Sequence, residues 1–473
     1  METTPVPPVP PPAQAVPSLQ PGLHANGITA PQWGNRRILA LVLPLLAEQF
    51  LIGSMGFINL FMAGFISEAA VSGVSLVETI AFLFTTIFTA LATGGAVVTS
   101  QYLGRADKKN SCSSARHVVY INVAVSLIFM ALTLVFYRHL LRLAFGDIAQ
   151  DVMQAAQTYF FISAFSLPFL GLYSACAALF RSMGHSGITM RIAVLVNIIN
   201  IGANLIFIHG FGFDIASPAL ASLIGRFTAA FILFFMLLRN SPRAINLKGI
   251  TRFSFDWQMI KRILNVGVPT SLEMSMFQFG KILIARIFTY FGTAAIAANA
   301  AATAITSLGF FTCNAFSMAA VTIAGQCLGA GDYDGAKRNT KKLVAATFIV
   351  YFILNLIIIV FRNQFIGIFR LSQEAHEMAV TFILIHAFFS TLFWATSFVL
   401  PNALRAAGDA RYVMIVSAST MWIVRVSAAF IMAFPLGMGP NAVWIAMGAD
   451  FVFRTFFFCT RWARGRWMEK RVI

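Results

Sequence analysis

Long apolar runs separated by short polar segments dominate this chain of 473 residues. A helix that crosses a bilayer needs about 20 mostly apolar residues, and twelve stretches reach about that length. They lie approximately at 38–60, 76–100, 115–137, 156–180, 188–209, 217–238, 262–288, 296–326, 340–361, 378–404, 412–434 and 442–461. The runs are continuous and lack the alternation of membrane β-strands. The pattern therefore predicts an all-α polytopic membrane protein with twelve transmembrane helices.

Composition and charge agree with this assignment. Hydrophobic residues make up 58% of the chain and charged residues 11%, with a mean hydropathy of +0.78, outside the usual range of soluble domains. The net charge is +17, but few basic residues follow odd-numbered spans (Arg138, Arg142, Arg362 and Arg370). Most of the others lie in the tails and after even-numbered spans, which is the pattern of cytoplasmic loops. We therefore expect a multi-pass protein of a bacterial inner membrane, with both termini cytoplasmic and no nucleic-acid partner.

The chain also contains an internal repeat. Shifting residues 44–107 forward by 225 positions, without a gap, aligns identical residues through helix, loop and helix. The aligned pairs include Pro44 with Pro269, Glu48 with Glu273, Gln101 with Gln326, Gly104 with Gly329 and Asp107 with Asp332. After one deletion the match resumes, and Arg181 aligns with Arg405. Two consecutive halves of like topology are typical of transporters, so two lobes of six helices are expected.

These patterns divide the chain into four parts. We expect a disordered, proline-rich cytoplasmic tail at 1–35, an N-lobe at 36–238, a cytoplasmic linker at 239–261, and a C-lobe at 262–473 that ends in a basic tail. The five cysteines form no CxxC pair, so neither a disulfide framework nor a metal site is indicated. The sequence has no HExxH or GxSxG motif, and we expect a monomer that is not an enzyme and uses no cofactor.

Three spaced segments are distinctive: GVPTSLEMSMFQFGKILIARIFTYFGTAAIAANA, then QYLGRADKKNS with its echo GQCLGAGDYDGAKR, and WIAMGADFVFRTFFFCTRWARGRW. Together they resemble the multidrug and toxin extrusion (MATE) family, from about residue 36 to the C-terminus. The resemblance implies two six-helix lobes around a V-shaped cavity that opens alternately to either side. It also implies exchange of entering H⁺ or Na⁺ for an organic, often cationic, compound.

Glu48 and Glu273 place one carboxylate in each lobe at matching depth. Glu48 lies 11 residues after Arg37 and Glu273 lies 11 residues after Arg262, about 16 Å along a helix and near mid-membrane. Burial in hydrocarbon disfavours a charged carboxylate, so such a group can hold a proton and exchange it for a cation. The alternative is a structural role inside each lobe, at the kink near Pro44 or Pro269. A Na⁺ ion at Glu273 is also possible on this pattern, and no other metal site is indicated.

Asn59 marks a departure from the family pattern. Many MATE proteins have an aspartate in a motif that reads roughly MGφφD, with φ apolar, and here the motif is MGFIN. An amide cannot titrate, which puts coupling at Asn59 in doubt. We expect Glu78, a few residues into the next helix, to take over the acid role together with Glu48. The alternative is that Glu78 is partly exposed at the outer interface.

The helix at 262–288 departs from the family in a second way. One branch of the family has a glutamate four residues after the position of Glu273, where this chain has Phe277. Gln278 and Lys281 are three residues apart and share a helical face. We expect Lys281 to pair with a carboxylate, with snorkelling to the outer surface as the alternative. Flexible and aromatic side chains that could line the cavity and bind cations are Met55, Phe57, Met276 and Phe277.

The remaining polar residues of the spans have structural explanations. Asn197, Asn200 and Asn204 share one helical face and either bind a polar ligand or ion, or tie the helix to its neighbours. Asp450 and Arg454 are spaced for an ion pair within one helix. Arg226 and Arg425 are expected to hydrogen-bond inside their lobes, and His386 to be packed and hydrogen-bonded. The LG…D turns at Leu103–Asp107 and Leu328–Asp332 predict helix ends, with glycine at the C-terminus and aspartate as the next cap.

The sequence thus predicts a secondary antiporter that exports organic cations or amphipathic drugs by alternating access, with H⁺ or Na⁺ as the coupling ion. Its partners would be a small-molecule substrate, that ion and the lipid bilayer. The alternative from a second class is a flippase for a lipid-linked substrate. A flippase would favour arginines in the cavity for phosphate groups, whereas the candidates here are acids, amides and one lysine.

Overall fold

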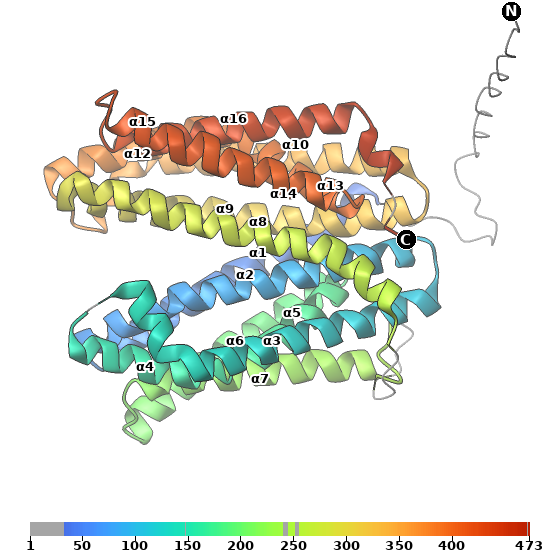
Figure 1. Cartoon of the computed structure of the whole chain (residues 1–473), viewed down its shortest axis with the longest axis horizontal. Helices are drawn as coiled ribbons and strands as arrows, with labels where there is room; N and C mark the ends of the chain where they lie inside the picture. Colours follow the sequence, from blue (N-terminus) through green and yellow to red (C-terminus); the bar gives the residue numbers. More distant parts are fainter. Residues whose placement is uncertain (1–32, 147, 240–244, 251–254, 471) are drawn as a thin grey trace, which may run out of the picture.

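The computed structural model describes residues 33–146, 148–239, 245–250, 255–470 and 472–473, and the regular elements of this part are all helices (Figure 1). The first half contains α1 (Asn35–Ala63), α2 (Glu68–Gly104), α3 (Lys108–Phe145), α4 (Gln150–Ala164), α5 (Leu167–Ser182), α6 (Ser186–Leu205) and α7 (Ala216–Leu238). The second half contains α8 (Trp257–Tyr290), α9 (Gly292–Gly329), α10 (Tyr333–Val360), α11 (Arg362–Gly367), α12 (Gln373–Trp394), α13 (Leu400–Ala406), α14 (Ala410–Ser419), α15 (Ser427–Ala433) and α16 (Asn441–Ala463).

Short turns of other helix types extend these elements. The π-helical turns are η1 (Ile206–Gly210) after α6, η2 (Ala395–Val399) between α12 and α13, and η3 (Thr420–Val426) between α14 and α15. The last element is a 3₁₀ turn, η4 (Arg466–Glu469). The predicted spans at 378–404 and 412–434 are therefore each one continuous path of several helical segments.

Most predicted spans are helices apolar enough to cross a membrane. Ten helices of the described residues pass by length and composition, and α4 with α5, bent by 51° at their junction, forms an eleventh. The predicted span at 262–288 is α8, which is 34 residues long but carries Glu273, Gln278 and Lys281. It packs against α2 of the N-lobe and α14 of the C-lobe. We therefore count α8 as the twelfth transmembrane helix, made more polar than the others by these side chains.

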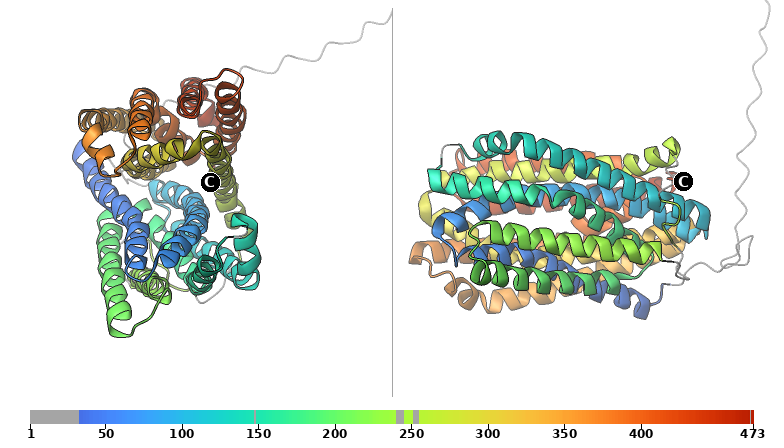
Figure 2. Two further views of the ribbon diagram at one scale, coloured as in Figure 1. Left: turned by 90° about the vertical axis from the view of Figure 1, so that its left-hand side faces the viewer. Right: turned by 90° about the horizontal axis from the view of Figure 1, so that it is seen from below.

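The helices form two bundles, the N-lobe (α1–α7) and the C-lobe (α8–α16). In Figure 1 the blue-to-green helices occupy one side of the molecule and the yellow-to-red helices the other. Figure 2 (left) shows the same division with the helices seen end-on. Each lobe has a buried apolar core of its own, for example Phe88 with Tyr159 in the N-lobe and Phe382 with Trp444 in the C-lobe.

The lobes meet through α1 against α9 and through α2 against α8 and α9. Leu41 and Leu45 of α1 share a buried cluster with Phe316 and Ile323 of α9. In Figure 1, α2 and α8 lie together near the side where α2 ends and diverge toward the other side. We call the end of the bundle where α2 and α9 finish the basic end, because the basic segments 105–109 and 337–342, at the starts of the following helices, adjoin it. The end where α1 and α8 finish is the far end.

The glycines of the two LG…D turns have a different role from the one expected. The left-handed residues after α2 and α9 are Ala106 (φ 59°) and Gly331 (φ 77°) rather than Gly104 and Gly329. A Cβ at Gly104 would collide with the backbone of Gln326, and one at Gly329 with the backbone of Gln101. These two glycines therefore permit close approach of the lobes.

The aspartates of the same turns act as helix caps, as predicted. Asp107 Oδ1 accepts a hydrogen bond from the backbone N–H of Asn110 at 3.0 Å. Asp332 Oδ1 accepts one from the Gly335 amide at 2.7 Å. Each carboxylate thereby satisfies a free N–H at the start of the following helix.

The ends of the predicted parts need correction where the structure describes them. Of the predicted tail at 1–35, residues 1–32 lie outside the described residues, whereas Trp33 is buried and α1 begins at Asn35. The predicted linker at 239–261 ends early, because α8 begins at Trp257 with Asp256 as its cap. The basic C-terminal tail packs against the end of α16. Trp467 is fully buried and stacks on Trp462 with ring centres 4.3 Å apart.

Candidate functional site

Glu48 of α1 is part of a buried ion pair within the N-lobe. Its Oε1 accepts a hydrogen bond from Arg181 Nη1 of α5 at 2.8 Å, and its Oε2 accepts one from Thr189 Oγ1 of α6 at 2.5 Å. Glu48 has no exposed surface and Arg181 is 8% exposed. Both carboxylate oxygens are thus occupied by groups of the same lobe, and the three helices α1, α5 and α6 are tied together.

The C-lobe repeats this arrangement. Glu273 Oε2 of α8 accepts a hydrogen bond from Arg405 Nη2 of α13 at 2.6 Å, and both side chains are buried. Arg405 also donates to Asn402 Oδ1 at 2.7 Å. These contacts correspond to the structural alternative for Glu48 and Glu273. Removing either acid would leave a buried guanidinium without its carboxylate, which is costly.

Glu78 lies in a different environment, toward the far end of the N-lobe. Its Oε1 accepts hydrogen bonds from Tyr159 Oη of α4 at 2.7 Å and from Asn59 Nδ2 of α1 at 3.0 Å. Glu78 is half-buried, and none of the ion pairs found among the described residues includes it. Its hydrogen-bond donors are therefore neutral groups. Glu78 thus lies beside Asn59, and its role as the N-lobe acid stays a prediction.

Asn59 is the centre of this polar group. It is 1% exposed, and its Nδ2 also lies 3.0 Å from Ser222 Oγ of α7. Ser222 in turn accepts a hydrogen bond from Asn200 Nδ2 of α6 at 3.2 Å. We call Asn59, Glu78, Tyr159, Asn200 and Ser222 the N-lobe polar cluster. It joins α1, α2, α4, α6 and α7 and offers several oxygen atoms within one small volume.

The other amides of α6 connect helices. Asn197 Nδ2 donates to the carbonyl of Leu51 in α1 at 3.1 Å. Asn204 Nδ2 donates to the carbonyl of Asn200 within α6 at 2.9 Å. Of the three amides on this face, Asn200 is thus a member of the N-lobe polar cluster, whereas Asn197 ties α6 to α1.

The C-lobe has a charged group at a similar distance from the far end. Asp450 Oδ1 accepts a hydrogen bond from Arg454 Nε at 2.8 Å, the predicted pair within α16. Arg425 Nη1 of η3 lies 4.0 Å from Asp450 Oδ2. The Phe277 ring of α8 is adjacent to three cations, with Arg425 Cζ and Arg454 Cζ each 5.6 Å from its centre and Lys281 Nζ at 6.0 Å. We call these five residues the C-lobe charged cluster.

The expected carboxylate partner of Lys281 is not found. The ion pairs of the described residues do not include Lys281, and its ammonium group instead lies near the Phe277 ring. Asp450, the acid of this cluster, is bonded to Arg454 instead. The sequence predicted acids, amides and one lysine as the polar residues of the central cavity. The structure groups two further basic residues, Arg425 and Arg454, with Lys281.

The residues predicted to be structural lie inside their lobes. Arg226 Nη1 of α7 donates to Ser166 Oγ at 2.6 Å. Arg425 is 8% exposed. His386 of α12 is buried between the rings of Trp394 and Trp444. The packing expected of this histidine agrees with these contacts, whereas its Nδ1 has no hydrogen-bond partner among the described residues, so the expected hydrogen bond is not found there.

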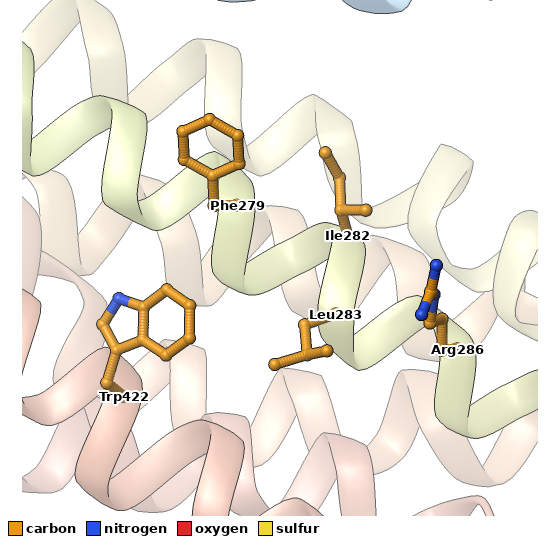
Figure 3. Close-up of a pocket in the computed structure, with 5 residues that line it drawn as sticks. All are labelled: Phe279, Ile282, Leu283, Arg286 and Trp422. Carbon is orange, nitrogen blue, oxygen red and sulfur yellow. The ribbon is translucent and has the colours of Figure 1, made fainter. Parts of the chain in front are cut away.

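The predicted cavity-lining residues are not in one place. Phe57 is exposed, Met55 packs against the N-lobe core, Met276 is exposed on α8, and Phe277 is half-buried in the C-lobe charged cluster. Gln278 is half-buried one turn from Lys281. An open pocket of about 440 Å³ on α8 and η3 is lined by other residues, Phe279, Ile282, Leu283, Arg286 and Trp422 (Figure 3).

Several contact residues were missed from the sequence. Arg181 and Arg405 were seen as a repeated pair, but not as the partners of Glu48 and Glu273. Their joint repetition was the available signal, since residues that bond each other are retained together in both copies. Tyr159 and Ser222 gave no such signal, because a lone hydroxyl in an apolar span has many possible roles.

Contacts between the lobes at the basic end are also repeated. Gln101 Nε2 donates to the carbonyl of Ala406 in the C-lobe at 2.6 Å, and Gln326 Nε2 donates to the carbonyl of Ser182 in the N-lobe at 2.7 Å. Both glutamines are buried. Since each lobe donates one such bond and accepts the other, the seam at the basic end has approximate two-fold symmetry.

Comparison with known proteins gives one consistent family. A family model described as MatE matches residues 44–206 and again residues 269–431. The two matches are 225 positions apart at both ends, the same shift as the internal repeat. Together they cover more than half of the chain.

Individual relatives agree along almost the whole length. A probable multidrug resistance protein NorM of Thermotoga maritima is 25% identical over 443 residues, covering 93% of this chain and 94% of the relative. An uncharacterized transporter, YisQ, of Bacillus subtilis is 24% identical over 440 residues, covering 92% and 95%. A solved structure of MATE in the bent conformation matches with a TM-score of 0.84 and 18% identity, covering 91% of this chain and 95% of that one.

Proposed function

Since the chain belongs to the MATE family of multidrug efflux transporters, we propose that it exports organic compounds in exchange for an entering cation, by alternating access between its two lobes. The observation that carries the proposal is the N-lobe polar cluster. It contains a transmembrane carboxylate, Glu78, whose donors are neutral side chains. Such a carboxylate can bind or release a cation without breaking an ion pair with an arginine.

The other buried acids are less suited to this exchange. Glu48 and Glu273 each have a guanidinium at hydrogen-bond distance, and Asp450 is bonded to Arg454. A proton or Na⁺ arriving at any of them would have to compete with a fixed positive charge at contact distance. This argues against a Na⁺ ion at Glu273. We therefore assign the coupling role to Glu78 and a structural role to the two repeated glutamates.

The N-lobe polar cluster suits either coupling ion. A carboxylate in the membrane can carry a proton. Hard cations such as Na⁺ prefer oxygen ligands, and the cluster offers oxygens of Glu78, Asn59, Tyr159 and Ser222. Efflux driven by an imposed pH gradient or by an imposed Na⁺ gradient distinguishes the two ions.

The seam at the basic end supports an assignment of conformation and orientation. The basic segments next to it fit the cytoplasmic side. The close contacts of Gly104 and Gly329 with the opposite lobe lie at this end. We therefore infer that the structure represents a state closed toward the cytoplasm, in a bacterial inner membrane with both termini inside.

The test is gradient-driven transport of a cationic dye from reconstituted vesicles. Tetramethylrhodamine methyl ester is loaded into proteoliposomes, and efflux is measured under an imposed pH gradient or an imposed Na⁺ gradient. We expect one gradient to drive efflux by the wild type and by the Glu68→Gln variant, which removes an exposed acid from the same helix. Glu78→Gln is expected to reduce driven efflux to the level of empty vesicles.

Two results would contradict the proposal. If neither gradient moves the dye in the wild type, export of organic cations is wrong. If Glu78→Gln retains driven efflux, the coupling acid has to be sought elsewhere. Expression level and melting temperature of each variant are measured in parallel, so that loss of transport is not confused with loss of protein.

A further inference from the structure

The C-lobe charged cluster contains more positive than negative charge. Lys281, Arg425 and Arg454 contribute three cations, and Asp450 contributes one carboxylate. Ionisable residues within a membrane span are costly and usually have a partner. The excess of two positive charges therefore needs an explanation.

The hydrogen bonds of the cluster leave part of it unoccupied. Arg454 is well held, because it donates to Asp450 and to the carbonyl of Ser417 at 3.1 Å. Arg425 is 8% exposed, its nearest carboxylate oxygen is 4.0 Å away, and its Nε has no hydrogen-bond partner. Asp450 Oδ2 likewise has no hydrogen bond. Arg425 is thus a buried guanidinium with donors to spare.

The Phe277 ring compensates only partly. Each cation over the face of an aromatic ring gains about 0.5–2 kcal/mol, and one ring has two faces for three cations. An ion pair with hydrogen bonds is the usual partner of a guanidinium, and a carboxylate matches its planar fork. The missing partner of this cluster is therefore anionic.

The repeat places Lys281 at an informative position. Shifted by 225, Lys281 is equivalent to Gly56 of α1 in the N-lobe. A Cβ at Gly56 would lie 3.8 Å from Glu78 Oε2, and this is the nearest atom to it. The same helical position thus faces the acid of the N-lobe and carries a base in the C-lobe. The lysine thus stands at the helical position that faces an acid in the other lobe.

We propose that Lys281 and Arg425, beside the Phe277 ring, form a binding site for the carboxylate of a transported aromatic compound. The proposal rests on the proposed function, because transport of the bound compound is taken from there, and it adds the chemical class of that compound. The N-lobe polar cluster would receive the cationic part of such a compound, or the coupling ion once the compound has left. The substrate class then includes zwitterionic and acidic aromatic compounds besides organic cations.

The side chains of the site have distinct roles. Arg425 supplies a planar pair of donors from a buried position, and Lys281, which is exposed, supplies a mobile point charge at the entrance. Arg454 remains with Asp450 and fixes the position of the Phe277 ring. The open pocket lined by Phe279 and Trp422 lies on the same two elements, α8 and η3 (Figure 3). The α8 residues of this pocket lie on the face of the helix opposite Phe277 and Lys281, so the pocket is separate from the proposed site.

The test compares two dyes that differ only in the acid group. Tetramethylrhodamine has a free carboxylate, and its methyl ester does not. Binding of each dye is measured by fluorescence anisotropy, with the purified full chain in nanodiscs of phosphatidylcholine and with empty nanodiscs as the blank. We expect the wild type to prefer the acid, and Lys281→Gln to weaken binding of the acid by about tenfold or more, the usual effect of losing a charged hydrogen bond.

Three controls keep the result specific. Binding of the ester should change little in Lys281→Gln, and Lys281→Arg, which keeps the charge, should restore binding of the acid. Arg286→Gln removes a cation five residues further along the same helix and should leave the preference for the acid intact. Arg425→Gln should act like Lys281→Gln, and its melting temperature shows whether it folds.

The outcomes separate this inference from the proposed function. Equal binding of the two dyes, no binding of the acid, or equal losses for both dyes in Lys281→Gln would each overturn the anion site. Nanodiscs of phosphatidylglycerol distinguish a lipid source, because loss of the acid's binding there would assign the site to lipid headgroups and overturn the substrate assignment. Binding of the acid without driven efflux would support the site and contradict export.

Discussion

The two ends of the bundle differ in how closely the lobes copy each other. Toward the basic end, the N-lobe and C-lobe share a buried glutamate–arginine pair, an inter-lobe glutamine and an inter-lobe glycine. Toward the far end, the equivalents of Gly56, Asn59 and Glu78 are a lysine, an isoleucine and a threonine. Equivalent polar residues of the two lobes are thus the same toward the basic end and different toward the far end.

This difference separates structural from functional roles. A seam between two rotated copies gains from symmetry, because one set of complementary contacts is used twice. A site that binds an asymmetric compound and a separate coupling ion has no such constraint. We therefore read the symmetric half as the closing device and the divergent half as the substrate and ion sites. The predictions below follow from this division.

The largest effects are expected from the two repeated ion pairs. Glu48→Gln and Glu273→Gln each leave a buried guanidinium without its carboxylate, which costs about 3–5 kcal/mol of stability. We expect both variants to melt well below the wild type in detergent, by similar amounts. Glu68→Gln, at an exposed position, is the matched control and should have no effect. A large loss for one glutamate and none for the other would break the symmetry of this half.

The next effect concerns the close approach of the lobes. Gly104→Ala and Gly329→Ala place a methyl group against the backbone of the opposite lobe, and overpacking costs about 1–3 kcal/mol. We expect each to favour opening at the basic end, measured as a longer distance between spin labels at Lys109 and Lys337 in a cysteine-free background.

Gly187→Ala is the control for this experiment, because a Cβ there meets nothing within 4 Å. Unchanged label distances in the two seam variants would mean that these glycines do not hold the closed state.

A smaller and equal effect is expected from the inter-lobe glutamines. Gln101→Leu and Gln326→Leu each remove one buried hydrogen bond across the seam, which contributes about 0.5–1.5 kcal/mol. The same label distance should shift part of the way toward the open state, by a similar amount in each variant. Unequal shifts would indicate that the seam is held mainly from one side.

The smallest effect is expected from the amide that ties α6 to α1. Asn197→Ala removes the hydrogen bond to Leu51, and interhelical bonds in membranes average about 0.6 kcal/mol. We expect a slight fall in melting temperature and unchanged driven efflux. Loss of efflux in a stable protein would instead place Asn197 in the ion site.

The symmetric half was the more predictable from sequence. The repeat identified Glu48, Glu273, Arg181, Arg405, Gln101 and Gln326 before their contacts were known. What sequence could not provide was the pairing, because an acid and an arginine 133 positions apart meet only when the fold brings the side chains of α1 and α5 together. For the same reason the glycines of the LG…D turns were assigned to helix ends, although their neighbours come from the other lobe.

The divergent half was less predictable. The absence of the family aspartate at Asn59 directed attention to Glu78, and the two side chains meet because α1 and α2 are adjacent in sequence and in contact. The expected carboxylate partner of Lys281 was wrong, since which cations Asp450 meets depends on packing among α8, η3 and α16. The cavity-lining role of Met55, Phe57, Met276 and Phe277 stays a prediction, because helical position alone does not say which face meets the other lobe.

The central claim is that the N-lobe acid has moved from the position of Asn59 to Glu78. Asn59 Nδ2 lies 3.0 Å from Glu78 Oε1, so a carboxylate at either position lies in the same polar cluster. The most direct measurement is driven dye efflux by Glu78→Gln, with and without the second change Asn59→Asp. The account predicts that the single variant loses efflux and that the double variant regains it. Efflux that survives in the single variant, or a folded double variant without efflux, would contradict it.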